Sequence, residues 1–326
     1  MRRREFVLAL GAVFVVAAIP AMAQSRNMAL VGLLDHGSAD ARRPLWGALR
    51  QRLHELGYVE GRNVTFEGRW AEGQAERLPA LAVDLVVRNV DVIVTAGILA
   101  AIAAQQATSS IPIVTATGSD PVRMGIVGSL ARPASNVTGV TTQTEETSGK
   151  RLELLRELIP TLSRLGVLSD KANPSTERQS EDTRAVARAW GLSVEMFSVR
   201  GPDEFEAAFF VFVGAGTEAL IVPSSPMLFS ARQRLAELAL KHRLPMAVAQ
   251  REYAEAGGLL AYASNLAEGF RRAAGFVDRI LKGAKPDDLP FEQPTSFNLV
   301  INLGTAAALG LMVPPSLLAR ADEVIE

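Results

Sequence analysis

The chain has 326 residues, no cysteine and a formal net charge of −1 at pH 7. The lack of cysteine excludes disulfides, thiol catalysis, cysteine-ligated metals and a lipid attached through an N-terminal cysteine. The near-neutral charge gives no sign of a nucleic-acid partner, and the length suits two domains of ordinary size.

Residues 1–23 have the three parts of a cleavable signal peptide. Arginines occupy 2–4, an apolar stretch occupies 6–19, and Ala21-Met22-Ala23 precedes Gln24. This pattern predicts export and cleavage after Ala23. The apolar stretch is shorter than the roughly 20 residues that span a bilayer, so we expect no membrane insertion of the mature chain. The paired arginines also fit a twin-arginine signal, and both this route and the Sec route stay open.

Short β-branched runs then alternate with amphipathic helical stretches, which is the pattern of parallel sheets covered by helices. The predicted strands are 29–34, 64–69, 91–95, 113–116, 137–141, 165–169, 193–199, 219–222, 246–249 and 259–262. Ten strands are too many for one small sheet. Predicted helices at 44–56 and 175–190 each end at a glycine, Gly57 or Gly191, that acts as a C-cap.

One unit occurs twice in the chain. An apolar strand, a helix and a strand opened by an aliphatic residue and proline occupy 91–114 and again 219–248. The repeat favours two Rossmann-like lobes of related α/β architecture, although a single doubly wound sheet can also contain two such units.

The connections between the lobes are predicted from composition. Flexible and β-branched residues at 136–143 indicate a crossing, with the boundary near Thr142, and the Pro- and Asp-rich stretch 283–294 indicates a return crossing. We therefore expect a multi-strand hinge. Lobe 1 would comprise 28–142 plus about 265–294, and lobe 2 would comprise 143–264 plus about 295–326.

Searches for catalytic motifs find little. The segment 214–219 has the glycine spacing of a dinucleotide-binding turn but precedes a strand instead of following one. The three histidines, His36, His54 and His242, are not at ligand spacing, and the acidic pairs at 145–146 and 287–288 fit solvated surface. We expect no catalytic residue, metal or cofactor.

Polar loops follow the predicted strands, at the edge where open α/β sheets bind ligands. The candidate ligand-binding residues are Asp35, His36, Trp70, Ala96, Gly97, Gly118, Ser119, Asp120, Asn173, Ser224, Ser225, Glu252 and Tyr262. Such loops suit a small polar solute held by hydrogen bonds.

Particular roles are expected for some of these residues. The segments 96–98 and 118–120 are predicted to open helices whose free N–H groups receive a carboxylate, although ordinary capping explains them equally well. Asp35, Asp120 or Glu252 would accept an ammonium group. Ser224 and Ser225 would complete the site. Trp70 or Tyr262 would stack on an aromatic ligand, with core packing as the alternative.

Collinear segments along nearly the whole chain carry a family resemblance. They are 55–64, which contains Leu56-Gly57-Tyr58-Val59-Glu60-Gly61, then 119–122, 129–133, 136–139, 251–253, 256–259, 280–286, 299–303 and 317–325. In these segments the chain resembles the ABC transporter substrate-binding proteins related to putative tryptophan/tyrosine importers. It departs from the family at Ala263, where glycine is common, at Ser296 and Asn298, and in the apolar run 209–213.

The resemblance implies a type I periplasmic binding protein fold and a function. The expected protein is a periplasmic, monomeric component of an ABC importer that captures a small solute, an amino acid or related carboxylate, between two lobes. Its partners would be a permease and, through the permease, an ATPase. Two alternatives stay open: a sensory module for a receptor or histidine kinase, and an α/β enzyme of unknown reaction.

Overall fold

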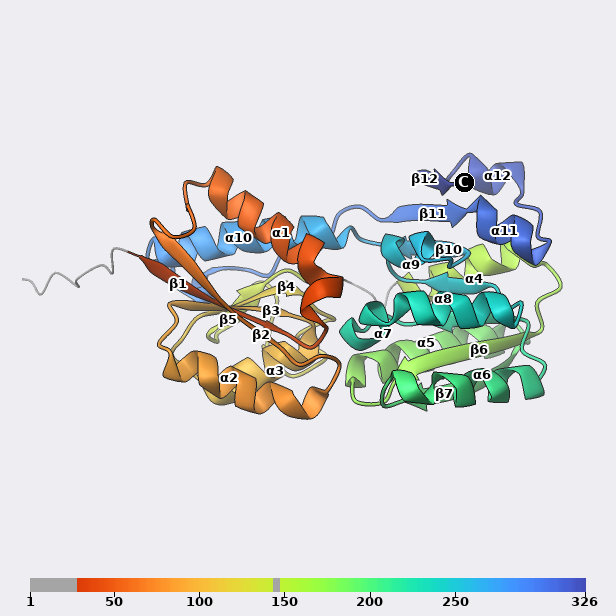
Figure 1. Ribbon diagram of the computed structural model, residues 1–326, viewed down its shortest axis with the longest axis horizontal. Helices are drawn as coiled ribbons and strands as arrows, with labels where there is room; N and C mark the ends of the chain where they lie inside the picture. The colour runs from red at the N-terminus through yellow and green to blue at the C-terminus, as the bar shows by residue number, and fades with distance from the viewer. Residues whose placement is uncertain (1–27, 143–146) are drawn as a thin grey trace, which may run out of the picture.

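The computed structural model describes residues 28–142 and 147–326. The predicted signal peptide, Gln143 and the acidic pair at 145–146 lie outside these ranges. The described chain forms two α/β lobes that lie end to end, each with its own sheet (Figure 1).

The sheet of lobe 1 has five strands in the order β2-β1-β3-β4-β5, and all neighbours are parallel. The strands are β1 Ala29–Asp35, β2 Val64–Trp70, β3 Val92–Ala96, β4 Ile113–Thr117 and β5 Val137–Gly139. The chain runs from β1 outward to β2 and then to β3 on the other side of β1. The carboxyl ends of β1 and β3 therefore form a topological switch point, where open sheets place ligands.

Helices cover both faces of this sheet because its strands are apolar on both sides. The helices are α1 Ala39–Glu55, α2 Leu78–Val87, α3 Ile98–Ala107 and α10 Leu266–Leu281, with a 3-10 turn η1 at Ala75–Arg77. Val92 and Val94 of β3 pack with α1 and α10, whereas the intervening Ile93 packs with α2 and α3. This alternation follows the two-residue period of a strand. Helix α10 thus joins lobe 1 from late in the sequence.

The sheet of lobe 2 has the order β12-β11-β10-β9-β8-β6-β7. Its strands are β6 Arg164–Asp170, β7 Ser193–Val199, β8 Ala219–Val222, β9 Met246–Val248, β10 Leu260–Ala263, β11 Asn298–Asn302 and β12 Glu323–Ile325. The run β7-β6-β8-β9-β10 repeats the connectivity of lobe 1. The unit detected twice in the sequence forms the third and fourth strands of this pattern in both lobes. Strand β11 is antiparallel to β10.

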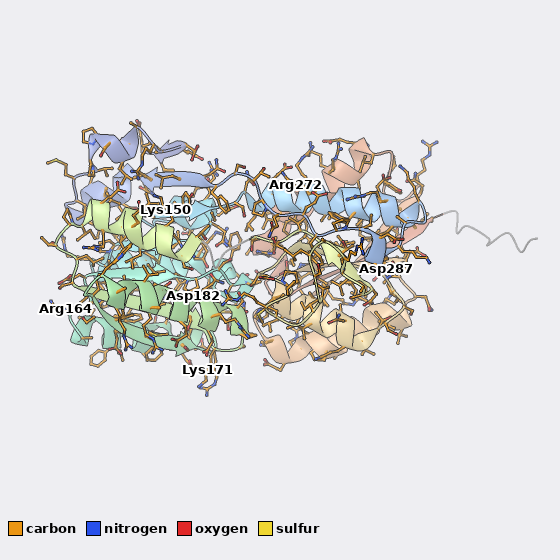
Figure 2. All side chains as sticks on the ribbon, turned by 180° about the vertical axis from the view of Figure 1, so that it is seen from behind. Lys150, Arg164, Lys171, Asp182, Arg272 and Asp287 are labelled. Atoms are coloured by element: carbon orange, nitrogen blue, oxygen red, sulfur yellow. The ribbon has the colours of Figure 1, made fainter. Side chains whose placement is uncertain are left out.

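Helices also cover both faces of the second sheet. They are α4 Thr147–Leu158, α5 Pro174–Ala189, α6 Phe205–Gly214, α7 Pro226–Ser230, α8 Arg232–Lys241, α9 Arg251–Glu255, α11 Leu303–Leu309 and α12 Pro315–Leu318, with a 3-10 turn η2 at Pro202–Glu204. A further 3-10 turn, η3 at Pro286–Asp288, packs against β5 of lobe 1. Leu220 and Val222 of β8 face α6 and α8, whereas Ile221 faces α4 and α5. Charged side chains such as Arg164, Lys171 and Asp287 project from the outer surfaces of both lobes (Figure 2).

The lobes are linked by chain segments that run side by side. Val140 forms a β-bridge with Glu292, and the Thr141 N–H donates to the Glu292 carbonyl at 2.9 Å. The Ser264 hydroxyl donates to the Thr142 carbonyl at 3.4 Å. Such mutually bonded segments form a hinge of more than one strand.

The fold confirms the predicted two-lobed α/β class. Most predicted elements differ from the observed ones by a residue or so at their ends, and three differences are larger. The strand predicted at 137–141 ends at Gly139, because Val140 and Thr141 turn to pair with Glu292. Helix α1 begins at Ala39 and contains Pro44, which the prediction had placed at its start. Strands β11 and β12 were not predicted, because their apolar cores are only two or three residues long. Within the described ranges no helix is long and apolar enough to cross a bilayer.

Candidate functional site

A small cavity lies between the lobes at the carboxyl ends of the strands. Its volume is about 30 Å³. It is lined by Arg42, Gly97, Ile98, Thr117, Gly118, Ser119, Thr142, Asn173, Ser224, Ser225, Pro226, Phe229, Gln250 and Leu266. Both lobes contribute, and the switch points of the two sheets face one another across it. A cavity needs roughly 10–15 Å³ to hold one water, so the cavity has room for about two.

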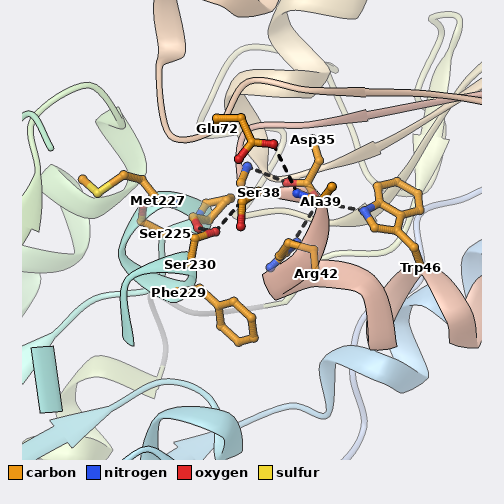
Figure 3. A network of polar contacts seen from close by, with 12 residues as sticks. Asp35, Ser38, Ala39, Arg42, Trp46, Glu72, Ser225, Met227, Phe229 and Ser230 are labelled. Carbon is orange, nitrogen blue, oxygen red and sulfur yellow. Dashed lines mark hydrogen bonds and ion pairs between the residues drawn. The ribbon is translucent and has the colours of Figure 1, made fainter. Parts of the chain in front are cut away.

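Several contacts hold the lobes together at this place (Figure 3). The Ser38 N–H of lobe 1 donates to the Ser230 hydroxyl of lobe 2 at 3.1 Å. The Ser119 hydroxyl is hydrogen-bonded to the hydroxyl of Ser175. The guanidinium of Arg42 lies over the ring of Phe229, with 5.2 Å to its centroid. The structure therefore has its lobes closed.

Asp35, at the end of β1, positions Arg42 in the cleft. Its carboxylate accepts from Arg42 Nε at 3.0 Å, from Trp46 Nε1 at 2.9 Å and from the Gly37 N–H at 2.8 Å (Figure 3). Arg42 is only 2% exposed, and its Nη2 has no hydrogen-bond partner. Among the described residues that line the cavity, Arg42 alone is charged. The cleft thus presents one buried cation with a free N–H.

The lobe 2 side has a matching polar network. Asp170, at the end of β6, accepts from the Ser225 hydroxyl at 2.6 Å and from the Ala172 N–H at 3.0 Å. Burial raises the pKa of Asp170 above its ordinary value, while the Ser225 hydrogen bond and the charge of His36 act in the opposite direction. His36 is itself fully buried, and neither ring nitrogen has a partner.

Gln250, which also lines the cavity, has a second unpartnered side-chain atom. Its Nε2 donates to the Ser224 hydroxyl, which leaves Oε1 without a partner although the residue is only 4% exposed. A buried acceptor of this kind costs free energy until a donor reaches it. Among the described side chains that line the cavity, Arg42 therefore has an orphaned buried donor and Gln250 an orphaned buried acceptor.

The structure brings about half of the predicted site residues to this cavity. Gly97, Gly118, Ser119, Asn173, Ser224 and Ser225 line it. Asp35, His36 and Ala96 are fully buried and do not line it. Glu252 lines a different cavity. Tyr262 stacks on Phe297 with ring centroids 5.9 Å apart, and Trp70 packs over Gly68.

One local prediction was wrong. The segment 118–120 does not open a helix: the Asp120 carboxylate accepts from the Val122 N–H at 2.8 Å and caps a single turn. Gly125 follows with φ of 72°, a left-handed conformation that stops a helical turn from continuing. The amides after β4 are therefore not a helix terminus.

The segment 96–98 does lead into helix α3, and Gly97 is its N-cap with no side-chain cap bond. Gly97 has φ of 88°, and a Cβ built there would lie 2.7 Å from Pro226 Cγ of the other lobe. A glycine is thus needed for close approach of the two lobes. The first amides of α3 point to the end of the sheet where Arg42 lies, and helix N-termini favour anions.

Residues that the sequence reasoning missed include Arg42, Phe229 and Gln250. Arg42 lies on an amphipathic helix, where a cation ordinarily faces solvent, and here its ion pair with Asp35 holds it inside the protein. Gln250 belongs to a loop recognised as polar, and no sequence signal separates it from Glu252. Across residues 28–142 and 147–326, no cluster of histidine and acidic side chains could hold a metal ion.

Comparisons with known proteins agree with this geometry. The family model for ABC transporter substrate binding proteins matches residues 27–325. A tyrosine-binding protein of Clostridioides difficile is 24% identical over 288 residues, which is 88% of this chain and 82% of the relative. An ABC domain from Streptococcus pneumonia solved in complex with L-Trp has 26% identity and a TM-score of 0.85, covering 91% of this chain and 100% of that one.

A more distant structure shares the fold. The leucine-binding protein LivK from Thermotoga maritima has 15% identity and a TM-score of 0.55, over 73% of this chain and 70% of its own. The predicted type I periplasmic binding protein fold is confirmed. The matched proteins are binding proteins rather than enzymes, and the family model covers almost all of the described residues. This chain belongs to the ABC transporter substrate-binding protein family.

Proposed function

We propose that the protein is the exported solute-binding component of an ABC importer and that its ligand is an α-amino acid or a related small carboxylate. One observation supports the proposed class of ligand. The cavity between the lobes has an unpartnered cationic donor, Arg42 Nη2, and an unpartnered neutral acceptor, Gln250 Oε1.

An α-amino acid satisfies both atoms at once. Its carboxylate would accept from Arg42 and from the first amides of α3, where the helix dipole adds to the attraction. Its ammonium group would donate to Gln250 Oε1. The carboxylate of Asp35 is already engaged by three donors, so it serves to hold Arg42 rather than to bind an ammonium group.

Ligand binding is coupled to closure in this proposal. A cavity of about 30 Å³ admits an amino acid only when the lobes lie further apart than in this structure. A solute that binds groups from both lobes stabilises the closed arrangement, because the bound form includes contacts that the open form lacks. At a hundredfold excess over Kd this stabilisation amounts to about 2.7 kcal/mol.

The remaining parts of the proposal concern assembly and location. Residues 1–23 would direct export and be removed after Ala23, which an intact-mass measurement of periplasmic protein checks. The mature monomer, with lobe 1 formed by 28–142 and 265–294 and lobe 2 by 143–264 and 295–326, would deliver its solute to a permease driven by an ATPase. The family match and the names of the relatives support transport.

A thermal-shift screen tests the ligand class. The twenty amino acids are compared with their decarboxylated amines, with deaminated acids and with a set of sugars. For phenylalanine, the matched compounds are phenethylamine and 3-phenylpropanoate. A true ligand at a hundredfold excess over Kd should raise Tm by about 5 to 11 °C, taking about 2–4 °C per kcal/mol for a lobe-sized unit. Calorimetry then ranks affinities. If the amines bind as tightly as the parent amino acids, or if only sugars bind, the carboxylate site is wrong.

A further inference from the structure

A second and larger cavity adjoins the cleft on the lobe 2 side. Its volume is about 180 Å³, and its lining includes two residues of the first cavity, Gln250 and Leu266. It lies among the first turn of α9, the link from β10 to α10, and the ends of β11 and β12. The two cavities therefore adjoin at Gln250 and Leu266, so the second cavity lies beside a head group that occupies the cleft.

The floor of the second cavity is apolar and its rim is acidic. Ala263, Leu266 and Val300 are buried side chains that line it. The rim carries Arg251, Glu252, Asp322 and Glu323. Three of these four charges have partners on the protein. Arg251 pairs with Glu323 at 2.6 Å and with Glu255 at 2.5 Å, and Asp322 accepts from the Leu299 N–H at 2.7 Å.

Glu252 is the exception among these groups. Its carboxylate has neither a hydrogen bond nor an ion pair within the described part of the chain, although it lines the cavity and is half-buried. Gln250, with its unpartnered Oε1 and 4% exposure, provides a second acceptor at the junction of the two cavities. The second cavity thus offers acceptors above an apolar floor and, apart from the paired Arg251, no charged donor.

We propose that this second cavity is a side-chain subsite of the same solute, and that Glu252 accepts a hydrogen bond from a donor at the far end of the ligand side chain. The inference rests on the proposed function, since the amino-acid head must occupy the cleft. An enclosed cavity of about 150 Å³ holds benzene, so about 180 Å³ accommodates one six-membered ring or a four-carbon chain. A phenolic hydroxyl and a side-chain ammonium group can both donate a hydrogen bond to Glu252, whereas Glu252 repels a side-chain carboxylate.

Two pairs of ligands isolate the far-end donor. L-Tyrosine and L-phenylalanine differ by one hydroxyl, and L-lysine and L-norleucine differ by a terminal ammonium group. Because a hydrogen bond to a charged group strengthens binding by roughly tenfold or more, the donor-bearing member of at least one pair should bind at least about tenfold more tightly in calorimetry. L-Glutamate should bind more weakly than either donor-bearing ligand.

The variant Glu252→Gln tests the assigned acceptor. It should weaken the preferred donor-bearing ligand by about tenfold and leave its donor-free counterpart within about twofold of the wild-type affinity. The matched control is Glu195→Gln, which removes one charge from β7 at the far edge of the same sheet. The control should change neither affinity. Melting temperatures of both variants verify that they are folded.

The outcomes separate this inference from the proposed function. If both members of each pair bind equally, or if a tenfold preference persists in Glu252→Gln, the subsite assignment is wrong while the cleft site stands. If none of the five amino acids binds and the wider screen finds no carboxylate ligand, the proposed function fails and the subsite fails with it. A donor preference that disappears only in Glu252→Gln supports the assignment.

Discussion

Replacing Arg42 with methionine should reduce both stability and ligand affinity, and the structure gives the size of each effect. The Arg42–Asp35 pair has an N–O distance of 3.0 Å and side chains that are 3% and 0% exposed. Removing one member of a buried pair leaves an uncompensated charge and costs about 3–5 kcal/mol. At about 2–4 °C per kcal/mol, Tm should fall by about 6–20 °C. Loss of the carboxylate contact should weaken binding by about 10- to 150-fold.

A double variant separates the two effects. Asp35→Asn combined with Arg42→Met removes both charges, so no lone charge is buried, and the asparagine keeps an oxygen acceptor near Trp46. Its Tm should recover toward the wild-type value while its affinity stays as weak as that of the single variant. Differential scanning fluorimetry and calorimetry with the amino acid from the screen measure the two quantities. A folded Arg42→Met protein that binds this amino acid as tightly as the wild type would refute the reasoning.

Two further variants test the polar network and the closure of the lobes. Because burial raises the pKa of Asp170 above 3.8, ionising it costs more in the folded than in the unfolded protein. The unfolding free energy of the wild type relative to Asp170→Asn should therefore fall as pH rises from about 3.8 through the folded-state pKa of Asp170. Urea titrations between about pH 4 and 8 measure this difference, and a difference that does not change with pH would contradict the expectation. Gly97→Ala should oppose closure, because its Cβ meets Pro226 Cγ at 2.7 Å and its φ is 88°. Ligand affinity should fall by about fivefold to over a hundredfold. Adding Pro226→Ala should restore part of this affinity. If small-angle scattering shows that Gly97→Ala compacts on ligand addition as much as the wild type does, glycine is not required at this position.

Local sequence patterns predicted the strands well where a strand is either apolar throughout, as in β8, or alternates apolar and polar residues, as in β7. Strands β7 and β8 have the predicted bounds, Ser193–Val199 and Ala219–Val222, because runs of β-branched and apolar residues are bounded by turn residues on both sides. Strand β12 escaped prediction because Glu323 and Glu326 enclose only two apolar residues, and it exists through its pairing with β11. Pairing of that kind depends on tertiary structure rather than on local pattern.

The site was predictable in position but less so in chemistry. Loops after parallel strands identify the ligand edge of each sheet, which is why Gly97, Ser119 and Ser224 lie in the cleft. Whether an individual polar side chain is free for a ligand depends on partners distant in space. Asp35 looked available in the sequence and is fully bonded in the fold, whereas Arg42, which no sequence motif singled out, has the unpartnered donor.

The central claim is that the solute is held between the lobes by groups that are unpartnered without it. A crystal structure of the mature protein with its tightest-binding amino acid tests this most directly. We expect the ligand in the cleft, its carboxylate within hydrogen-bond distance of Arg42 Nη2 and its ammonium group on Gln250 Oε1. A ligand bound to one lobe only, or outside the cleft with both atoms still unpartnered, would contradict the account.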